Sequence, residues 1–272
     1  MSVELHIIRL ALDRRQLMRL AARHHFPRAL DEGYLLHAGL AELFASSHER
    51  ANVPLLTFAA DETAPQARAD PATLYLLAYS DLSAADLVSL MGPARSHLLR
   101  DCVAKPMPSL AAGARAGFRV RVCPVVRTRQ PSPQSSSAGT SGIGRLREVD
   151  ALLLHPAGTA QTEGTAAAAA PFEGAARTWS ARQRAYGAWL SHEVGRFGAA
   201  QLQSEPRLAS FRLTNTYRRG APGDRPRRRP DAVLEGALTV SDSTGFDALL
   251  RRGIGRHRAF GFGMLLLCPA EE

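Results

Sequence analysis

Lysine is almost absent from this sequence, and so are the patterns of a membrane span or a secreted protein. Lys105 is the only lysine among 34 basic residues, so arginine carries nearly all of the positive charge. No apolar run approaches the roughly 20 residues that a membrane-spanning helix needs. Residues 1–6 lack the basic region and apolar stretch of a signal peptide. We therefore expect a soluble protein of the cytoplasm.

Cysteine is scarce as well. Cys102, Cys123 and Cys268 are widely separated, show no Cys-x-x-Cys spacing, and each lies beside apolar residues in a strand-like run. We expect three buried free thiols in a reducing compartment and not a disulfide framework. Histidine and cysteine patterns typical of zinc sites are missing too. We accordingly expect neither a metal nor a cofactor.

In place of these features the sequence has an excess of positive charge. A net charge of +9 and a pI near 10.4 point to a polyanionic partner, chiefly nucleic acid or an acidic membrane surface. Arginine suits phosphate because its planar guanidinium holds two oxygens at once. The codon composition of a GC-rich genome would also favour arginine over lysine. The positions of the arginines are therefore stronger evidence for a nucleic-acid partner than their number.

Two similar series of strand and helix patterns follow one another along the chain. In the first half, strand patterns cover 3–12, 54–60, 73–80 and 97–104, and helical patterns cover 13–25, a stretch that opens at 31–32, and 83–91. In the second half, strand patterns cover 118–127, 208–217, 232–240 and 260–268, and helical patterns cover 179–195 and 243–252. Strand, helix, strand, strand, helix, strand is the ferredoxin-like order.

This order predicts an α+β protein of two tandem ferredoxin-like (RRM-like) βαββαβ domains. We expect an N-terminal domain at 1–106 and a C-terminal domain at 114–272. Within the second domain, residues 130–176 contain tracts rich in Ser, Gly, Pro, Thr and Ala, which are typical of flexible linkers or long loops.

Arginines gather around a glycine- and proline-containing turn in the second half. Between Arg212 and Arg229 there are seven arginines and one acid, Asp224. A hairpin with such a tip suits phosphate contacts along an RNA backbone. A solvated loop that keeps the protein soluble is the alternative. The candidate RNA-binding residues here are Arg218, Arg219, Arg225, Arg227, Arg228 and Arg229.

A second basic cluster is interleaved with glycine near the C-terminus. Arg256, His257 and Arg258 lie within a loop that also contains Gly253, Gly255, Gly261 and Gly263. Glycines let a backbone approach a ligand closely and point its N–H groups at phosphate. Neither the P-loop nor the dinucleotide-binding pattern is present, and turn formation alone would also explain the glycines.

Tyr34 and His37 are the candidates for catalysis. Metal-free RNA cleavage needs a group that takes the proton of the ribose 2′-OH, and histidine carries protons near neutral pH. On a helix the three-residue spacing puts the phenol and the imidazole on the same face, about one turn apart. The alternative is an aromatic residue and a histidine at an ordinary helix–sheet contact.

The sequence resembles the CasE family, the repeat-processing subunit of type I-E CRISPR surveillance complexes (Cascade). The resemblance lies in four stretches in the family's order, 34–40 (YLLHAGL), 118–127 (FRVRVCPVVR), 234–240 (LEGALTV) and 252–265 (RGIGRHRAFGFGML). They are similar to the family's Tyr-x-x-His-x-x-Leu helix, its Phe-Arg-Leu-Arg strand, its Phe-Glu-Gly-x-Leu strand and its C-terminal glycine-rich loop.

The resemblance implies two ferredoxin-like domains and metal-independent cleavage of precursor CRISPR RNA at the base of the repeat stem-loop. The 2′-OH attacks the adjacent phosphate, which leaves a 2′,3′-cyclic phosphate and a 5′-hydroxyl. Carried over, His37 is the general acid/base and Tyr34 its partner at the phosphate. The arginine hairpin would bind the stem by recognising the phosphate backbone and the shape of the RNA. The enzyme would stay on the 3′ hairpin of the mature RNA, beside the other Cascade subunits and away from any membrane.

The sequence also departs from the family at residues near this site. Ala38 follows the histidine where some relatives carry a basic residue. Arg256 and Arg258 surround a position where relatives often have lysine. The cation that stabilises the transition state is therefore not assigned.

Two other function classes fit parts of the sequence. A non-catalytic RNA-binding scaffold of the same fold would keep the basic hairpin and be indifferent to replacement of His37. A binder of membrane surfaces or of polyanions in general is disfavoured, because the basic residues lie in a turn and a glycine loop and not along an amphipathic helix.

Overall fold

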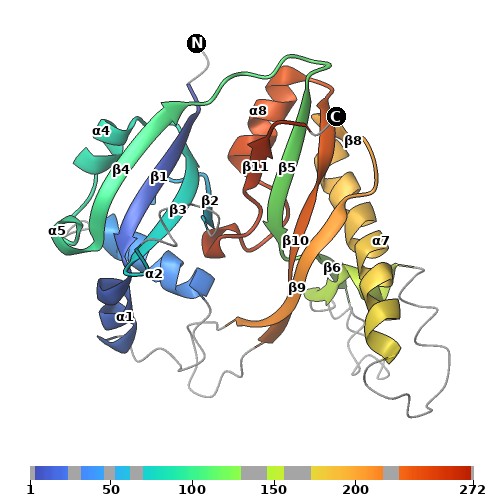
Figure 1. Cartoon of the computed structure of the whole chain (residues 1–272), viewed down its shortest axis with the longest axis horizontal. Helices are drawn as coiled ribbons and strands as arrows, with labels where there is room; N and C mark the ends of the chain where they lie inside the picture. Colours follow the sequence, from blue (N-terminus) through green and yellow to red (C-terminus); the bar gives the residue numbers. More distant parts are fainter. Residues whose placement is uncertain are drawn as a thin grey trace, which may run out of the picture.

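The structure is a computed structural model that describes residues 4–23, 32–45, 53–61, 70–129, 146–155, 173–216 and 227–270 (Figure 1). It contains two antiparallel sheets, each associated with its own helices, and a separate two-stranded ribbon. In Figure 1 the first sheet lies on the left and the second on the right. No helix in the described part of the chain is long and apolar enough to cross a membrane.

The first sheet has the strand order β2-β3-β1-β4. Its strands are β1 (His6–Asp13), β2 (Thr57–Ala60), β3 (Thr73–Ser80) and β4 (Leu99–Pro106). The helices α1 (Arg14–Arg23) and α2 (Glu32–Leu43) connect β1 to β2, and α4 (Ala84–Ser89) and α5 (Arg95–Leu98) connect β3 to β4. This is the ferredoxin-like arrangement.

The helices of the first half cover one face of this sheet because their apolar residues recur at helical spacing. Leu17, Leu20 and Ala21 of α1 are buried, and Leu36 and Leu40 of α2 join the same core. Ser83 caps α4 by accepting a hydrogen bond from the main-chain N–H of Asp86, as the Ser-x-x-Asp pattern predicts.

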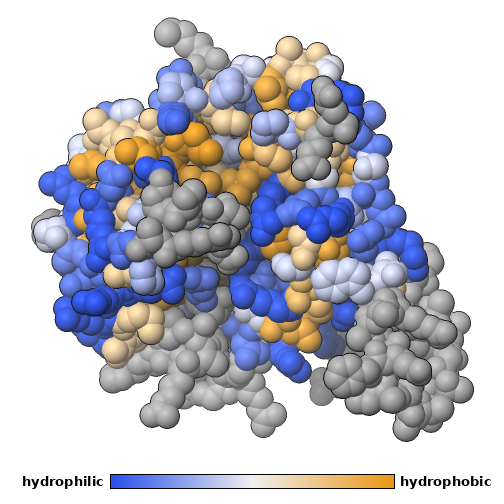
Figure 2. Space-filling model, in the orientation of Figure 1, coloured by the Kyte–Doolittle hydropathy of each residue, from blue (hydrophilic) through white to orange (hydrophobic). Residues whose placement is uncertain are grey.

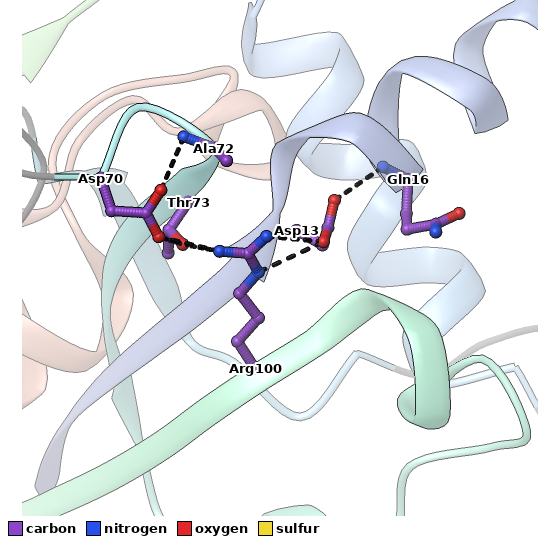
Figure 3. A network of polar contacts seen from close by, with 6 residues as sticks. All are labelled: Asp13, Gln16, Asp70, Ala72, Thr73 and Arg100. Carbon is purple, nitrogen blue, oxygen red and sulfur yellow. Dashed lines mark hydrogen bonds and ion pairs between the residues drawn. The ribbon is translucent and has the colours of Figure 1, made fainter.

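Arg100 ties three segments together at one end of the first sheet (Figure 3). Its guanidinium donates to Asp13 at 2.8 Å and to Asp70 at 2.8 Å, and also to the hydroxyl of Thr73. Asp13 in turn accepts from the main-chain N–H of Gln16 at the start of α1. Since the hydrogen bond from Arg100 holds the pKa of Asp13 below its ordinary value, this carboxylate stays ionised at neutral pH.

The second sheet repeats the arrangement with an interrupted edge. Its order is β11-β5-β10-β8, and β9 also pairs with β10. The strands are β5 (Arg115–Val122), β8 (Ala200–Leu202), β9 (Arg207–Thr216), β10 (Arg227–Val240) and β11 (Leu265–Cys268). The helices α7 (Glu173–Gly195) and α8 (Ser243–Arg252) cover one of its faces. The α+β fold of two tandem ferredoxin-like units is therefore confirmed.

A short ribbon is inserted between β5 and α7. It consists of β6 (Val125–Arg129) and β7 (Leu146–Asp150), which pair antiparallel and lead into the 3₁₀ helix η1 (Ala151–Leu154). The Ser/Gly-rich tract and the alanine-rich tract that we expected to be flexible lie outside the described residues, apart from the flanking strands and the start of α7. The ribbon places Glu148 close to the C-terminal loop.

Several expected strands were wrong in their extent. The strands expected at 54–60 and 232–240 begin at Thr57 and Arg227, and three others include residues that belong elsewhere. The segment 118–127 is two strands that break at Cys123 and Pro124, because proline has no N–H for the ladder. His97 and Leu98 belong to α5 and precede the strand. Phe260 belongs to the 3₁₀ helix η2 (Arg258–Phe260), and the last strand begins only at Leu265.

The expectation of three buried thiols was also wrong in part. Cys123 is buried, Cys102 is half-buried and Cys268 is exposed at the C-terminal end of β11, and no disulfide joins them. Burial raises the pKa of the Cys102 thiol to about 11 and that of the Cys123 thiol to about 12. These two thiols are therefore protonated at neutral pH.

The two sheets share contacts through buried residues of the first half. Leu5, Ala59 and Tyr79 belong to the same apolar cluster as the core of the second sheet. The hydroxyl of Tyr79 donates a hydrogen bond of 2.9 Å to the main-chain carbonyl of Leu265. On the face seen in Figure 2, apolar residues gather over the upper part of the first sheet and continue toward the second sheet. We propose that the domains divide at 107–113, where the chain forms neither helix nor strand.

Candidate active site

Tyr34 and His37 lie on α2 and face the C-terminal loop. Both residues contact the ring of Phe260 from η2. The Tyr34 ring is stacked on Phe260 with centroids 6.0 Å apart, and the His37 ring is tilted against it at 5.2 Å. The three-residue spacing thus gives the shared face that the sequence predicts, and a loop from the other end of the chain covers it.

Gly33 lets this loop approach the helix closely. A Cβ atom at position 33 would lie 2.2 Å from the main-chain oxygen of Phe260, so any other residue would push the loop away. Gly33 belongs to the first turn of α2, one residue before Tyr34. The absence of a side chain at this position therefore sets the distance between the tyrosine–histidine pair and η2.

The glycines of the C-terminal loop fold it into a compact wall. Gly253, Gly255, Gly261 and Gly263 all have positive φ, between 69° and 84°, which disfavours residues with a Cβ. Protein atoms crowd the space that a Cβ would occupy at each of them, for example the Trp189 ring at Gly255. Turn formation and close packing thus account for all four glycines, and the prediction that they bind RNA stays a prediction.

The loop and α2 together enclose a pocket of about 710 Å³. The basic residues Arg251, Arg256, His257 and Arg258 line it together with His37. Its apolar wall is formed by Leu40, Val53, Leu55, Leu56 and Phe58. The cationic groups of this pocket could bind a phosphodiester, and its imidazole could accept a proton from an adjacent hydroxyl group.

Glu148 organises the basic side of this pocket, and the sequence did not single it out. Its carboxylate accepts from Nε of Arg256 at 2.9 Å, lies 3.2 Å from Nε2 of His257, and forms an ion pair with Arg229. The side chain is only 15% exposed. Burial raises the pKa of Glu148, but Arg229, His257 and Arg256 outweigh this, so the pKa lies below its ordinary value.

The two histidines at the pocket are both shifted toward the neutral form. Burial lowers the pKa of His37 below its ordinary value, and a hydrogen bond to the main chain of Ala259 opposes this. Burial and the charge of Arg229 lower the pKa of His257, whereas Glu148 opposes them. A neutral imidazole at position 37 is ready to accept a proton at neutral pH.

The predicted arginine hairpin lies only partly within the described residues. Arg218, Arg219 and Arg225 lie outside them, and only the main chain of Arg227 is described. Arg228 is exposed on β10. Arg229 is 14% exposed and held by Glu148, so the structure brings it to the pocket side of the hairpin with Arg256 and His257.

Further arginines line the face of the second sheet that α7 and α8 leave uncovered. Asp231, itself 3% exposed, accepts from Arg121 at 2.7 and 2.8 Å and from Arg212 at 2.7 Å. Arg119 and Arg207 likewise share Glu235. Cross-strand neighbours on β5, β9 and β10 thus form ion pairs in which each carboxylate is shared by two arginines, so the face keeps a net positive charge.

Among the described residues no group of three or more His, Cys, Asp or Glu side chains is arranged to hold a metal ion.

Comparison with known proteins gives a family and a fold. The family model described as CRISPR associated protein matches residues 5–269. A solved structure of the CRISPR endoribonuclease Cse3 bound to 19 nt RNA is 18% identical, with a TM-score of 0.57 over 98% of this chain and 100% of that chain. Cse3 of Thermus thermophilus, bound to an RNA representing a pre-cleavage complex, is 18% identical with a TM-score of 0.55 over the same shares. No curated protein matches the chain.

Proposed function

The chain belongs to the CRISPR-associated protein family, as its CasE-like motifs predicted, and on that premise we propose that it is an endoribonuclease that processes precursor CRISPR RNA. The observation that carries the proposal is the pocket that His37 lines together with Arg256, His257 and Arg258. The likeness in fold to Cse3, a CRISPR endoribonuclease solved with RNA, supports the same class of substrate.

The proposed reaction is a transesterification without a metal. The ribose 2′-OH loses its proton and its oxygen attacks the adjacent phosphorus, while the bond from phosphorus to the 5′-oxygen breaks and that oxygen takes up a proton. The products are a 2′,3′-cyclic phosphate and a 5′-hydroxyl. His37 carries the proton, and Tyr34, one helical turn away, donates a hydrogen bond to the phosphate.

The C-terminal loop supplies the positive charge in this proposal. Charge gathers on the phosphate oxygens as the fifth bond to phosphorus forms, and pre-oriented cationic donors stabilise it. Arg256 is fixed by Glu148, and Arg258 is exposed on η2. These two arginines are our candidates for the cation that the sequence left unassigned.

The substrate in this proposal is the stem-loop of the CRISPR repeat. Arg228 and the arginines of the hairpin would contact the phosphates of the stem, which is how duplex RNA is recognised by shape. The enzyme would then stay on the 3′ hairpin of the mature RNA. The other subunits of a Cascade complex, in which the CasE family acts, would be its protein partners.

Cleavage of a labelled repeat RNA from the host, measured in EDTA, tests the proposal. We expect wild type to cut once at the base of the stem, and His37→Ala to bind the hairpin normally but to cut about 10²- to 10⁴-fold more slowly. His97→Ala, at an exposed histidine on α5, is the matched control and should cut like wild type.

Other outcomes would point elsewhere. Equal cutting by wild type and His37→Ala would remove His37 from the mechanism. Loss of wild-type cutting in EDTA, restored by Mg²⁺, would contradict a metal-independent reaction. Tight hairpin binding by wild type without any cutting would favour the non-catalytic scaffold.

A further inference from the structure

Phe197 is a large apolar residue that the fold leaves in solvent. It lies in the turn between α7 and β8, and 71% of its surface is exposed, the largest exposed fraction among the large apolar residues described. Its φ is 75°, a left-handed conformation that is uncommon for a bulky residue. Because of this φ, a glycine would be less strained than phenylalanine at position 197. The next residue, Gly198, also has positive φ. An exposed aromatic residue held in strained backbone is a candidate for contact with another molecule.

Two guanidinium groups flank the Phe197 ring. The guanidinium carbon of Arg252 lies 4.5 Å from the ring centroid and that of Arg196 lies 5.4 Å from it. The carboxylate of Glu193 lies 3.8 Å from Arg196 and offsets part of this charge. Guanidinium groups that lie over an aromatic ring present, together with that ring, planar surfaces on which a base can stack and positive charge for the phosphate attached to it.

This surface is joined to the candidate active site through the arginines. The side chain of Arg258, which lines the pocket with His37, donates a hydrogen bond to the main-chain oxygen of Arg252. Burial lowers the pKa of Arg252, the charge of Glu193 opposes this, and the charges of Arg196 and Arg258 lower it further, as expected for guanidinium groups that lie near one another. A row of three guanidinium groups, partly offset by Glu193, thus runs from the pocket to Phe197. Such a row costs repulsion in the free protein and is relieved by a polyanion.

We propose that Phe197, Arg196 and Arg252 form a subsite for one unpaired nucleotide of the RNA strand that leaves the pocket. The base stacks on the Phe197 ring, and the guanidinium groups bind the adjoining phosphate. The inference rests on the proposed function, because it places the subsite beside the phosphate that is cut. It assigns single-stranded RNA to this surface, whereas the stem belongs to the hairpin.

Binding measurements with uncleavable RNAs test the subsite. The probes are synthetic host repeat hairpins with a 2′-deoxy nucleotide at the cut position. One ends at the stem base, two carry a few unpaired nucleotides on the 5′ or the 3′ side, and matched versions have abasic sites in the extension. The proteins are wild type, Phe197→Ala, Phe197→Trp and, as a control at another exposed apolar residue, Leu90→Ala. Thermal unfolding of each variant checks that it is folded.

We expect wild type to bind one of the two extended RNAs about tenfold more tightly than the bare hairpin, since a base stacked on an aromatic ring contributes on this scale. Phe197→Ala should lose that preference and keep its affinity for the bare hairpin. Phe197→Trp and Leu90→Ala should keep the preference, and abasic sites should abolish it in wild type.

Three results would overturn the inference. Equal affinities of Phe197→Ala and wild type for every RNA would show that Phe197 does not bind RNA and would favour contact with a protein partner. An undiminished preference for the abasic RNAs would mean that phosphates alone are bound. Failure of wild type to bind any hairpin would contradict the proposed function as well. If wild type binds and cuts the RNA but Phe197→Ala changes no affinity, only the subsite is contradicted.

Discussion

At the scale of single residues, the ionisation of His37 decides when the proposed proton transfer is possible. The ring of Phe260 packs against the imidazole, and burial disfavours the imidazolium, so the pKa of His37 is lowered. The hydrogen bond to the main chain of Ala259 only partly offsets this. The imidazole of His37 therefore stays neutral down to a lower pH than the imidazole of a free histidine.

The pH dependence of cleavage follows from this shift. Because the pKa of His37 is lowered from 6.5, we expect the acidic limb of kcat/KM to be centred below pH 6.5. Single-turnover cleavage measured over a range from acidic to slightly alkaline pH checks this. Residual activity of His37→Ala should lack that acidic limb, and a limb centred above pH 6.5 would contradict the assignment.

Glu148 is a second residue whose replacement has a definite expected result. Glu148→Gln removes the charge that holds Arg229, Arg256 and His257, so three basic groups would be left together. We expect a loss of about 2 kcal/mol in the free energy of unfolding and slower cleavage. Denaturant unfolding and single-turnover rates measure the two effects, with Glu205→Gln at an exposed site as the control.

The pH dependence of stability tests whether the charge of Glu148 is the cause of this loss. A carboxylate whose pKa is depressed in the folded state contributes stability above its unfolded pKa, which is lost as the pH falls through the folded value. The stability difference between wild type and Glu148→Gln should therefore be largest at neutral pH and shrink below pH 4.5. A difference that is constant with pH would show that the charge is not responsible.

At the scale of elements, the contact between α2 and η2 positions the pocket. Gly33→Ala would favour the helix by roughly 1 kcal/mol through propensity, but its Cβ would meet the main-chain oxygen of Phe260. We expect the clash to prevail, with a net loss of about 1–2 kcal/mol in stability and reduced cleavage.

Gly195→Ala at the end of α7 is the matched control for this contact. No atom of the described residues outside its own helix lies within 4 Å of the place that a methyl group would take there. Denaturant unfolding and cleavage rates of both variants check the prediction, and parallel results for the two would contradict the role of the contact.

The sequence predicted elements well where local signals mark both ends. The extents of β3 and α8 were predicted to the residue, since β3 is a short, mainly apolar run and Asp242 caps the start of α8. The end of β5 was missed because apolar residues continue past Pro124, and Phe260 was assigned to a strand because its apolarity outweighed the flanking glycines. Glu148 and Phe197 show no local pattern at all, since the contacts that define their surroundings come from distant segments.

At the scale of the whole molecule, a buried hydrogen bond joins the two sheets. The hydroxyl of Tyr79, a fully buried residue of β3, reaches the carbonyl of Leu265 on β11. Tyr79→Phe removes this hydrogen bond and keeps the ring, so we expect a loss of about 1 kcal/mol. Thermal unfolding measures it, and affinity for the repeat hairpin should stay unchanged. A loss of RNA affinity without a loss of stability would contradict a purely structural role.

The close approach of Gly33 to Phe260 has a consequence for how such a protein changes over generations. One position is near the start of the chain and the other near its end, yet the space at the first is filled by the main chain of the second. A bulkier residue at 33 is tolerable only if the loop shifts at the same time. We therefore expect residue 33 and the loop around residue 260 to change together, and a chimera that joins halves from distant homologues to fail at this contact even when each half folds.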